Sequence, residues 1–145
     1  MWQEANMYAK DLYEASYLKT NYRALVGRNY IDFRIDKVKR HQPWSITNDY
    51  VQEWTFVSAE NPRSVRITER ENALKSTMLL RYLHRRKLGY FFGLGIPDAE
   101  TWPVELGFFV INVSLLEAKS IGRKFHQNAI VFSKVLKPIE LIWLI

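Results

Sequence analysis

The sequence contains no cysteine, and it has only six glycines and five prolines among its 145 residues. The absence of cysteine excludes disulfide frameworks, cysteine-ligated zinc and iron–sulfur centres, and catalysis by a thiol. Long hydrophobic runs are also missing. The longest, Phe108–Ile111 and Leu141–Ile145, fall far short of the ~20 residues that a membrane-spanning helix needs. We therefore expect no segment that crosses a membrane.

Hydrophobic residues make up 48% of the chain and charged residues 25%, a mixture typical of a folded globular protein. A chain of this length buries roughly 68–70% of its unfolded surface, so it can build a core without disulfides or structural metal. We expect a single globular domain over residues 1–145. The first residues show no basic segment followed by an apolar stretch, so we read no secretory signal and expect a cytoplasmic protein.

The net charge of +6 is concentrated in one segment of the chain. Residues 63–87 contain eight basic side chains and two acidic ones, whereas the rest of the chain contains thirteen of each sign. An anionic partner is therefore expected at this segment first.

The hydrophobic pattern predicts three helices and six strands. Apolar residues recur at spacings of three and four in the first twenty residues, which indicates an amphipathic helix. Two capping boxes, Thr68–Glu71 and Ser114–Glu117, predict the starts of two more helices. The predicted strands are Tyr30–Ile35, Trp54–Ala59, Tyr90–Leu94, Leu106–Val113, Ala129–Phe132 and Ile139–Ile145. A polar stretch at Lys37–Asp49 predicts a mobile loop.

The predicted element order is αββαββαββ. Residues 54–133 within it form a βαββαβ unit, the order found in ferredoxin-like sheets. We predict an α+β fold, a two-layer sandwich with a ferredoxin-like core, to which an N-terminal helix and extra strands are added.

The segment Ser58–Ser64 and its continuation to Asn72 join the end of a strand to the start of a helix. Unpaired backbone N–H groups there favour an anion, and Arg63 adds a positive charge. The alternative is structural, since Asn61 followed by proline also forms turns. Glu105 and Gln127 likewise either tie down backbone groups or line a pocket together with Asn61 and Asn72.

The segment Arg81–Lys87 predicts a nucleic-acid contact through Arg81, Arg85 and Arg86, which can bind phosphates. Basic residues are also expected in the last turn of a helix, so this cluster has a second explanation. No RNA-recognition or zinc-finger pattern accompanies it.

No catalytic motif is present. The three histidines, His41, His84 and His126, belong to three different predicted elements. Glu60 and Glu105 stand at strand ends, where two carboxylates can perform acid–base chemistry, although surface or ion-paired glutamates have the same appearance in sequence. We therefore leave open whether the protein is an enzyme, and we expect no cofactor and no metal.

Several of these segments in combination resemble a bacterial family of domains of unknown function, the DUF3293 family. The resemblance rests on four stretches and spans roughly Tyr17 to Leu144. They are Ser58–Ser64, Glu71–Asn72, Trp102–Glu105 and Phe125–Ala129. The family has no assigned activity, but the resemblance directs attention to Asn61, Asn72, Glu105 and Gln127 and away from the histidines.

The leading hypothesis is a small domain that binds an anionic ligand, either a nucleotide or a nucleic-acid phosphate. The ligand site comprises Asn61, Arg63, Asn72, Glu105 and Gln127. Arg81, Arg85 and Arg86 add long-range attraction. One alternative is a hydrolase or transferase that acts on a phosphorylated substrate, with Glu60 or Glu105 as the base. Another is a protein-interaction adaptor that uses its many aromatic residues. The sequence does not indicate an oligomeric state.

Overall fold

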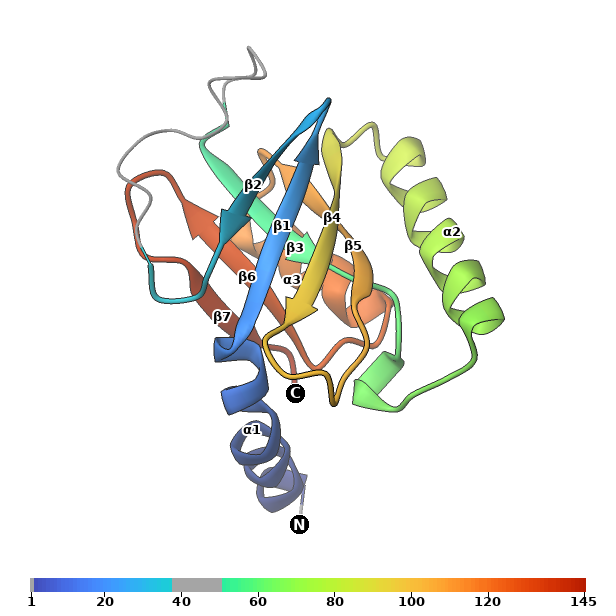
Figure 1. The fold of residues 1–145 in the computed structure, drawn as a ribbon, viewed down its shortest axis with the longest axis vertical. Helices are drawn as coiled ribbons and strands as arrows, with labels where there is room; N and C mark the ends of the chain where they lie inside the picture. The colour runs from blue at the N-terminus through green and yellow to red at the C-terminus, as the bar shows by residue number, and fades with distance from the viewer. Residues whose placement is uncertain (1, 38–50) are drawn as a thin grey trace.

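A computed structural model describes residues 2–37 and 51–145, and it describes the side chains of these ranges from residue 10 onward. Within these ranges the chain folds into three α-helices and seven strands (Figure 1). The elements are α1 (Trp2–Leu18), β1 (Thr20–Val26), β2 (Asn29–Phe33), β3 (Glu53–Val57), a short 3₁₀ helix (Pro62–Ser64), α2 (Glu69–Arg85), β4 (Tyr90–Pro97), β5 (Glu105–Ile111), α3 (Leu115–Lys124), β6 (Ala129–Lys134) and β7 (Glu140–Trp143).

The predicted α+β class is confirmed, and each predicted helix and strand has a counterpart. The loop predicted at Lys37–Asp49 lies, from residue 38 on, outside the described residues. None of the helices in the described ranges is long and apolar enough to cross a membrane.

The predicted element order is wrong at one point, because strand β1 was not predicted. Three strands, not two, lie between α1 and α2. Strand β1 pairs with β2 through a tight turn in which Gly27 has a φ of 59°. Its outward-facing Arg23 pairs with Asp32 of β2 at 2.8 Å, a polar cross-strand contact that a hydrophobic pattern does not reveal.

The seven strands form one antiparallel sheet in the order β2-β1-β4-β5-β3-β6-β7. The sheet is curled so strongly that its two edges approach each other. The N–H of Asp36, after β2, donates to the carbonyl of Ile139, before β7, at 2.7 Å. The N–H of Ile139 donates to the carbonyl of Lys37 at 3.1 Å. The curled sheet therefore has a concave inner face and a convex outer face.

The inner face encloses a core made largely of aromatic side chains. The Phe33 ring on edge strand β2 lies 4.6 Å from the Trp54 ring on β3, which is four strands away in the sheet order. Phe109 packs against both rings, with centroid distances of 5.5 and 5.2 Å. These contacts across the interior are possible only because the sheet curls.

The outer face packs against α2 and α3, which bury Leu79, Leu83 and Ile121. Both predicted helix starts are confirmed. The hydroxyl of Thr68 accepts a hydrogen bond from the N–H of Glu71, and the hydroxyl of Ser114 accepts one from the N–H of Glu117. Helices α2 and α3 therefore lie on one side of the sheet, whereas α1 extends from one end of it (Figure 1).

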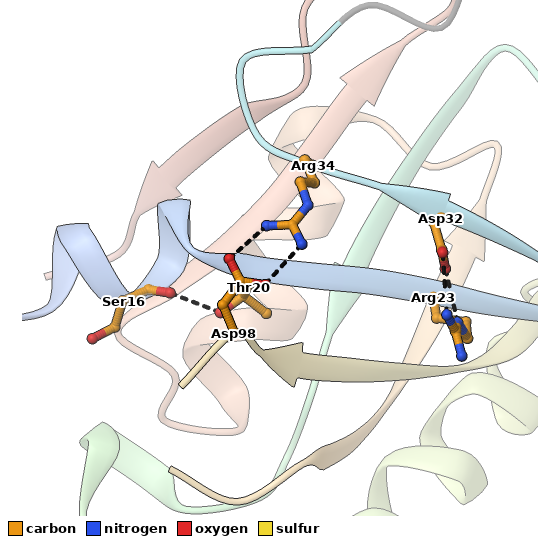
Figure 2. Close-up of polar contacts among 6 residues, drawn as sticks. All are labelled: Ser16, Thr20, Arg23, Asp32, Arg34 and Asp98. Carbon is orange, nitrogen blue, oxygen red and sulfur yellow. Dashed lines mark hydrogen bonds and ion pairs between the residues drawn. The ribbon is translucent and has the colours of Figure 1, made fainter. Parts of the chain in front are cut away.

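Polar contacts join α1 and the loop after β4 to the first hairpin, as Figure 2 shows. The hydroxyl of Thr20 donates to the carbonyl of Ser16 at 2.7 Å, which connects the last turn of α1 to β1. Arg34 donates two hydrogen bonds to the carboxylate of Asp98, at 2.9 and 2.8 Å. The N–H of Asp98 in turn donates to the carbonyl of Lys19 at 2.9 Å.

A glycine pair tests the tight packing of the inner face. A Cβ atom on Gly107 would lie 2.4 Å from the Phe56 ring and 2.9 Å from the carbonyl oxygen of Val57. We expect Gly107→Ala to lower the free energy of unfolding by about 1–3 kcal/mol, because neither neighbour has room to move away. A Cβ on Gly95, in neighbouring strand β4, would have its nearest neighbour at 3.8 Å, so Gly95→Ala is the matched control. Urea titrations of both variants measure the difference, and equal losses would contradict the packing described here.

Candidate functional site

A cavity of about 540 Å³ opens inside the curled sheet, at the end of the sheet where α1 leads into β1. Its walls come from α1, from the inner face of the sheet and from the loops that follow β3 and β4. Much of the lining is aromatic. The aromatic residues are Tyr13, Tyr17, Tyr22, Phe56 and Trp102. A volume in this range, with apolar walls and a few polar groups, is typical of small-molecule sites.

Asn61 is the centre of a hydrogen-bonded group at the cavity. Its side-chain amide donates to Oε1 of Glu105 at 2.8 Å. Its side-chain oxygen accepts from the N–H of Ile67 and from the side-chain amide of Asn72, both at 3.1 Å. Its backbone N–H donates to Oδ1 of Asn72 at 2.8 Å. Asn61 is only 4% exposed, so this residue links three segments of the chain in a water-poor setting.

The backbone around Asn61 is held in an uncommon conformation. Asn61, Arg63 and Ser64 all have positive φ angles, of 44°, 57° and 61°. Asparagine tolerates this region because its short side chain forms local hydrogen bonds, but arginine and serine rarely adopt it. Such residues persist only where the surrounding contacts determine the conformation, and they are concentrated at binding and active sites.

Glu105 is the acidic side chain among the described residues that line the cavity. Its Oε1 accepts from Asn61 and from the indole N–H of Trp102, at 2.8 and 3.0 Å. Within the described ranges no group hydrogen-bonds to Oε2. Burial raises the pKa of the Glu105 carboxyl above its usual range, and the nearby charge of Glu60 raises it further, whereas the bonds from Asn61 and Trp102 work in the opposite direction.

Glu60 lies beside the same strand end. Its Oε1 accepts from the N–H of Leu106 at 3.2 Å. Burial raises its pKa, and the hydrogen bond from Leu106 lowers it. Glu60 does not appear among the described residues that line the cavity, so the two carboxylates are neighbours of which only Glu105 faces the cavity.

Two tyrosine hydroxyls complete the polar lining. Burial raises the pKa of Tyr17 to about 12, and the charge of Glu105 contributes to this shift. Burial also raises the pKa of Tyr22 strongly. Both phenols are therefore neutral at physiological pH and can act as hydrogen-bond donors in the cavity.

Gln127 and Arg63 form further hydrogen bonds beside the Asn61 group. The side-chain amide of Gln127 donates to the carbonyls of Glu60 and Phe125, at 3.3 and 3.2 Å. The guanidinium of Arg63 donates to the backbone carbonyl of Gln127 at 3.2 Å. These bonds hold the turn after β3 against the turn after α3.

The structure brings together the five residues predicted as a ligand site, but they face different ways. Asn61, Glu105 and Gln127 line the cavity. Asn72 and Arg63 do not appear in its lining, and their described bonds go to Asn61 and to Gln127. Much of the polar capacity of these side chains is therefore used within the protein.

Arg81, Arg85 and Arg86 lie elsewhere, at the C-terminal end of α2 or directly after it, on the outer face of the sheet. His84 accompanies them and contacts the hydroxyl of Tyr90 at 2.7 Å, whereas His41 lies outside the described residues. Tyr17 and Tyr22 were not predicted as site residues from the sequence. Their only sequence signal is aromatic character beside polar neighbours, which is common in helices and strands that bury one side.

In the described part of the chain, no three His, Asp or Glu side chains come close enough together to hold a metal ion. A family model described as a protein of unknown function, DUF3293, matches residues 57–130, just over half of the chain. The chain belongs to the DUF3293 family. No curated protein and no solved structure matches it.

The span that matches DUF3293 contains the hydrogen-bonded group but not the whole cavity. Asn61, Asn72, Glu105 and Gln127 all fall within residues 57–130. Helix α1 and strand β1, which supply Tyr17 and Tyr22, lie before it. In this DUF3293 protein the hydrogen-bonded group around Asn61 thus belongs to the matched region, and the preceding residues add Lys19, Tyr17 and Tyr22 to the cavity lining.

Replacement of Asn61 tests the energetic weight of the hydrogen-bonded group. Asn61→Ala removes the side-chain hydrogen bonds to Glu105, to the side-chain amide of Asn72 and to the N–H of Ile67, and it places alanine at a positive φ. We expect the free energy of unfolding to fall by about 3 kcal/mol or more. Asn128 is also 4% exposed but has one side-chain bond, to Ser64 at 2.9 Å. Asn128→Ala should therefore cost about 1 kcal/mol. Chemical denaturation distinguishes the two, and a smaller loss for Asn61→Ala would contradict its central position.

The raised pKa of Glu105 predicts a pH-dependent stability. The folded state holds this proton more tightly than the unfolded chain, so the contribution is complete below the unfolded pKa and is lost as pH rises through the native pKa. Glu105→Gln keeps the acceptor oxygen and removes the titration, so its stability relative to the wild type should increase with pH above about 4.5. Asp98→Asn is the control of opposite sign, because Arg34 lowers the pKa of Asp98. If the stabilities of both variants relative to the wild type changed with pH in the same direction, the opposite pKa shifts of Glu105 and Asp98 would be contradicted.

Proposed function

We propose that this DUF3293 protein binds a small molecule in the cavity, and that the ligand carries an ammonium or another hydrogen-bond donor on an apolar body. The observation that carries the proposal is the Glu105 carboxylate, partly buried at a cavity wall with one oxygen held by Asn61 and Trp102. Its other oxygen is available to a ligand donor. A charge-assisted hydrogen bond in such a setting is stronger than one between neutral groups.

The aromatic lining supports the same ligand class. Five aromatic side chains surround the space next to a single carboxylate, and ring faces attract a cation electrostatically. Packing an apolar ligand body against these rings removes apolar surface from water, which makes binding more favourable. The neutral hydroxyls of Tyr17 and Tyr22 provide further polar contacts, which orient the ligand.

Ligand binding and the ionisation of Glu105 are coupled. An ammonium beside the carboxylate favours its charged form, which burial disfavours in the empty cavity. Binding of an amine is therefore expected to tighten as pH rises through the native pKa of Glu105, and the stability cost described above is then offset by the ligand.

An anionic ligand, predicted from the sequence, is the second candidate. Lys19 is the basic side chain among the described residues that line the cavity. The guanidinium of Arg66 lies 6.0 Å from the centre of the Trp102 ring, which is part of the wall. An anionic group at this rim would contact Lys19 and Arg66 and remain apart from Glu105. For this candidate we propose Arg66 in place of Arg63 as the arginine that contacts the anion, because the guanidinium of Arg63 is bonded to Gln127.

The other predictions have less support from the described contacts. A hydrolase or transferase would use Glu60 or Glu105 as its base, and the raised pKa of each fits that role. An adaptor would need exposed aromatic side chains, and Tyr30 and Phe92 are partly exposed at 59% and 43%. For the fold, we propose a ferredoxin-like core, which the strand order β4-β5-β3-β6 supports, with α2 and α3 as its two crossovers.

A matched set of small probes tests the proposal. Phenethylamine, phenethyl alcohol and phenylacetate share one aromatic body and differ in charge. We expect phenethylamine to bind best, and to shift the amide NMR signals of Tyr17, Tyr22 and Glu105 in a titration at pH 7. Glu105→Gln should weaken phenethylamine at least tenfold and change phenethyl alcohol less, because only the amine loses a charge-assisted bond. The control is Glu100→Gln, an exposed glutamate in the same loop region, which should leave all three affinities unchanged.

Two outcomes would decide against the proposal. If phenylacetate or adenosine monophosphate binds and the amine does not, the anionic candidate is correct. If none of the probes shifts the signals of cavity residues at millimolar concentration, the cavity is not a binding site for this ligand class.

A further inference from the structure

Helices α2 and α3, together with the turn that follows α2, carry the whole net charge of the protein. We call residues 69–87 and 115–124 the helix layer. It contains nine basic and three acidic side chains, a surplus of six, which equals the net charge of +6. The rest of the chain contains twelve of each sign. The layer covers the outer face of the sheet, so a positive surplus equal to the net charge lies on that side of the sheet (Figure 1).

The two helices contribute cations to one continuous surface. The Tyr82 ring of α2 lies 6.0 Å from the Phe125 ring, which follows α3. The ammonium of Lys124 lies 5.3 Å from the centre of the same Tyr82 ring, and the guanidinium of Arg86 lies 6.0 Å from it. Arg86 also pairs with Glu117 of α3 at 3.2 Å. These contacts hold the C-terminal half of α2 beside α3.

Few acidic groups oppose these cations. Glu69 and Glu71 lie in the first turn of α2, away from its basic end, and Glu71 also accepts from the Thr68 hydroxyl. Between residues 72 and 87 the chain has no Asp or Glu. Arg81 and Arg85 are exposed and form no ion pair within the described ranges. Exposed, weakly paired arginines on one face attract polyanions over a distance.

We propose that the helix layer is a second binding surface, which contacts the phosphate backbone of nucleic acid without reading its sequence. Charge complementarity carries the inference, because duplex DNA presents one negative charge per about 1.7 Å of its axis. Tyr82, the aromatic ring at the centre of the surface, is occupied by Lys124, Arg86 and Phe125 and is not free to stack on a base. A surface that contacts phosphates but no bases binds different nucleic-acid sequences with similar affinity.

This surface is independent of the cavity. The cavity opens on the inner face of the sheet, whereas the helix layer lies on the outer face, with the sheet and its two cores between them. The inference therefore does not rest on the proposed small-molecule site, and a variant at one surface should leave binding at the other unchanged.

The test measures the affinity of the full chain for a fluorescein-labelled 20-base-pair DNA of mixed sequence by anisotropy. We expect binding in 50 mM salt that falls with increasing salt, with a slope of log K against log salt of about −3 for three to four phosphate contacts. A second duplex of unrelated sequence should bind within about threefold of the first.

Two triple variants, each of which removes three positive charges, distinguish binding at the helix layer from a general effect of net charge. Arg81→Gln with Arg85→Gln and Lys124→Gln removes three cations from the helix layer, and we expect at least a tenfold loss and a shallower salt slope. Arg28→Gln with Lys37→Gln and Lys137→Gln removes three exposed cations elsewhere and should lose less than threefold. Thermal unfolding and phenethylamine binding of both variants show whether the fold and the cavity are intact.

Three results would overturn the inference. The first is no binding at 50 mM salt, and the second is an equal loss in the two triple variants. The third is binding to vesicles of 70% phosphatidylcholine and 30% phosphatidylserine without binding to the duplex. That last result would assign the surface to an anionic membrane instead, in keeping with the exposed Leu74 and Met78 on the same helix.

Discussion

The hydrogen bonds of the Asn61 side chain join the turn after β3 to the start of α2 and to the first residue of β5. Each of these segments ends or begins an element, so each has backbone or side-chain groups that the sheet and the helices leave without a partner. Asn61 supplies a donor and an acceptor to them at once, with distances of 2.8 to 3.1 Å. Because Glu105 is positioned by this residue, the only described carboxylate in the cavity depends on a contact between segments 44 residues apart.

The curl of the sheet divides the molecule into two environments with different chemistry. Its inner face holds aromatic rings and one partly buried carboxylate, the features on which the proposed small-molecule site rests. Its outer face carries the helix layer with its surplus of six positive charges, on which the proposed phosphate contact rests. The two proposals thus concern opposite faces of a single sheet and different sets of polar residues.

Local features of this fold could be predicted from the sequence, and those that depend on distant contacts could not. The hydroxyls of Thr68 and Ser114 cap their helices as expected, because a capping box needs only residues three apart. Strand β1 was missed because its inward positions include Thr20 and Ala24, one polar and one small, while the apolar Leu25 faces outward, so its alternation is weak. The curl depends on rings such as Phe33 and Trp54, which meet across four strands and leave no local pattern. The polar residues of the site were predicted, but their mutual hydrogen bonds were not. Tyr17 and Tyr22 were missed because they become wall residues only when the sheet curls.

Gly93 and Gly107 stand opposite each other on the neighbouring strands β4 and β5. On the inner face their missing side chains leave the space that Phe109 and Phe56 occupy. A Cβ on Gly93 would lie 2.5 Å from the Phe109 ring, so the close packing of the curled sheet at this pair requires glycine on both strands. Relatives with bulkier residues at both positions would need smaller rings or a flatter sheet, and a flatter sheet would enclose a wider and shallower chamber beneath α1. Exchange at these two positions, of which Gly107 is two residues from Glu105 on β5, would thus change the dimensions of the cavity that we propose as a ligand site while Glu105 itself is retained.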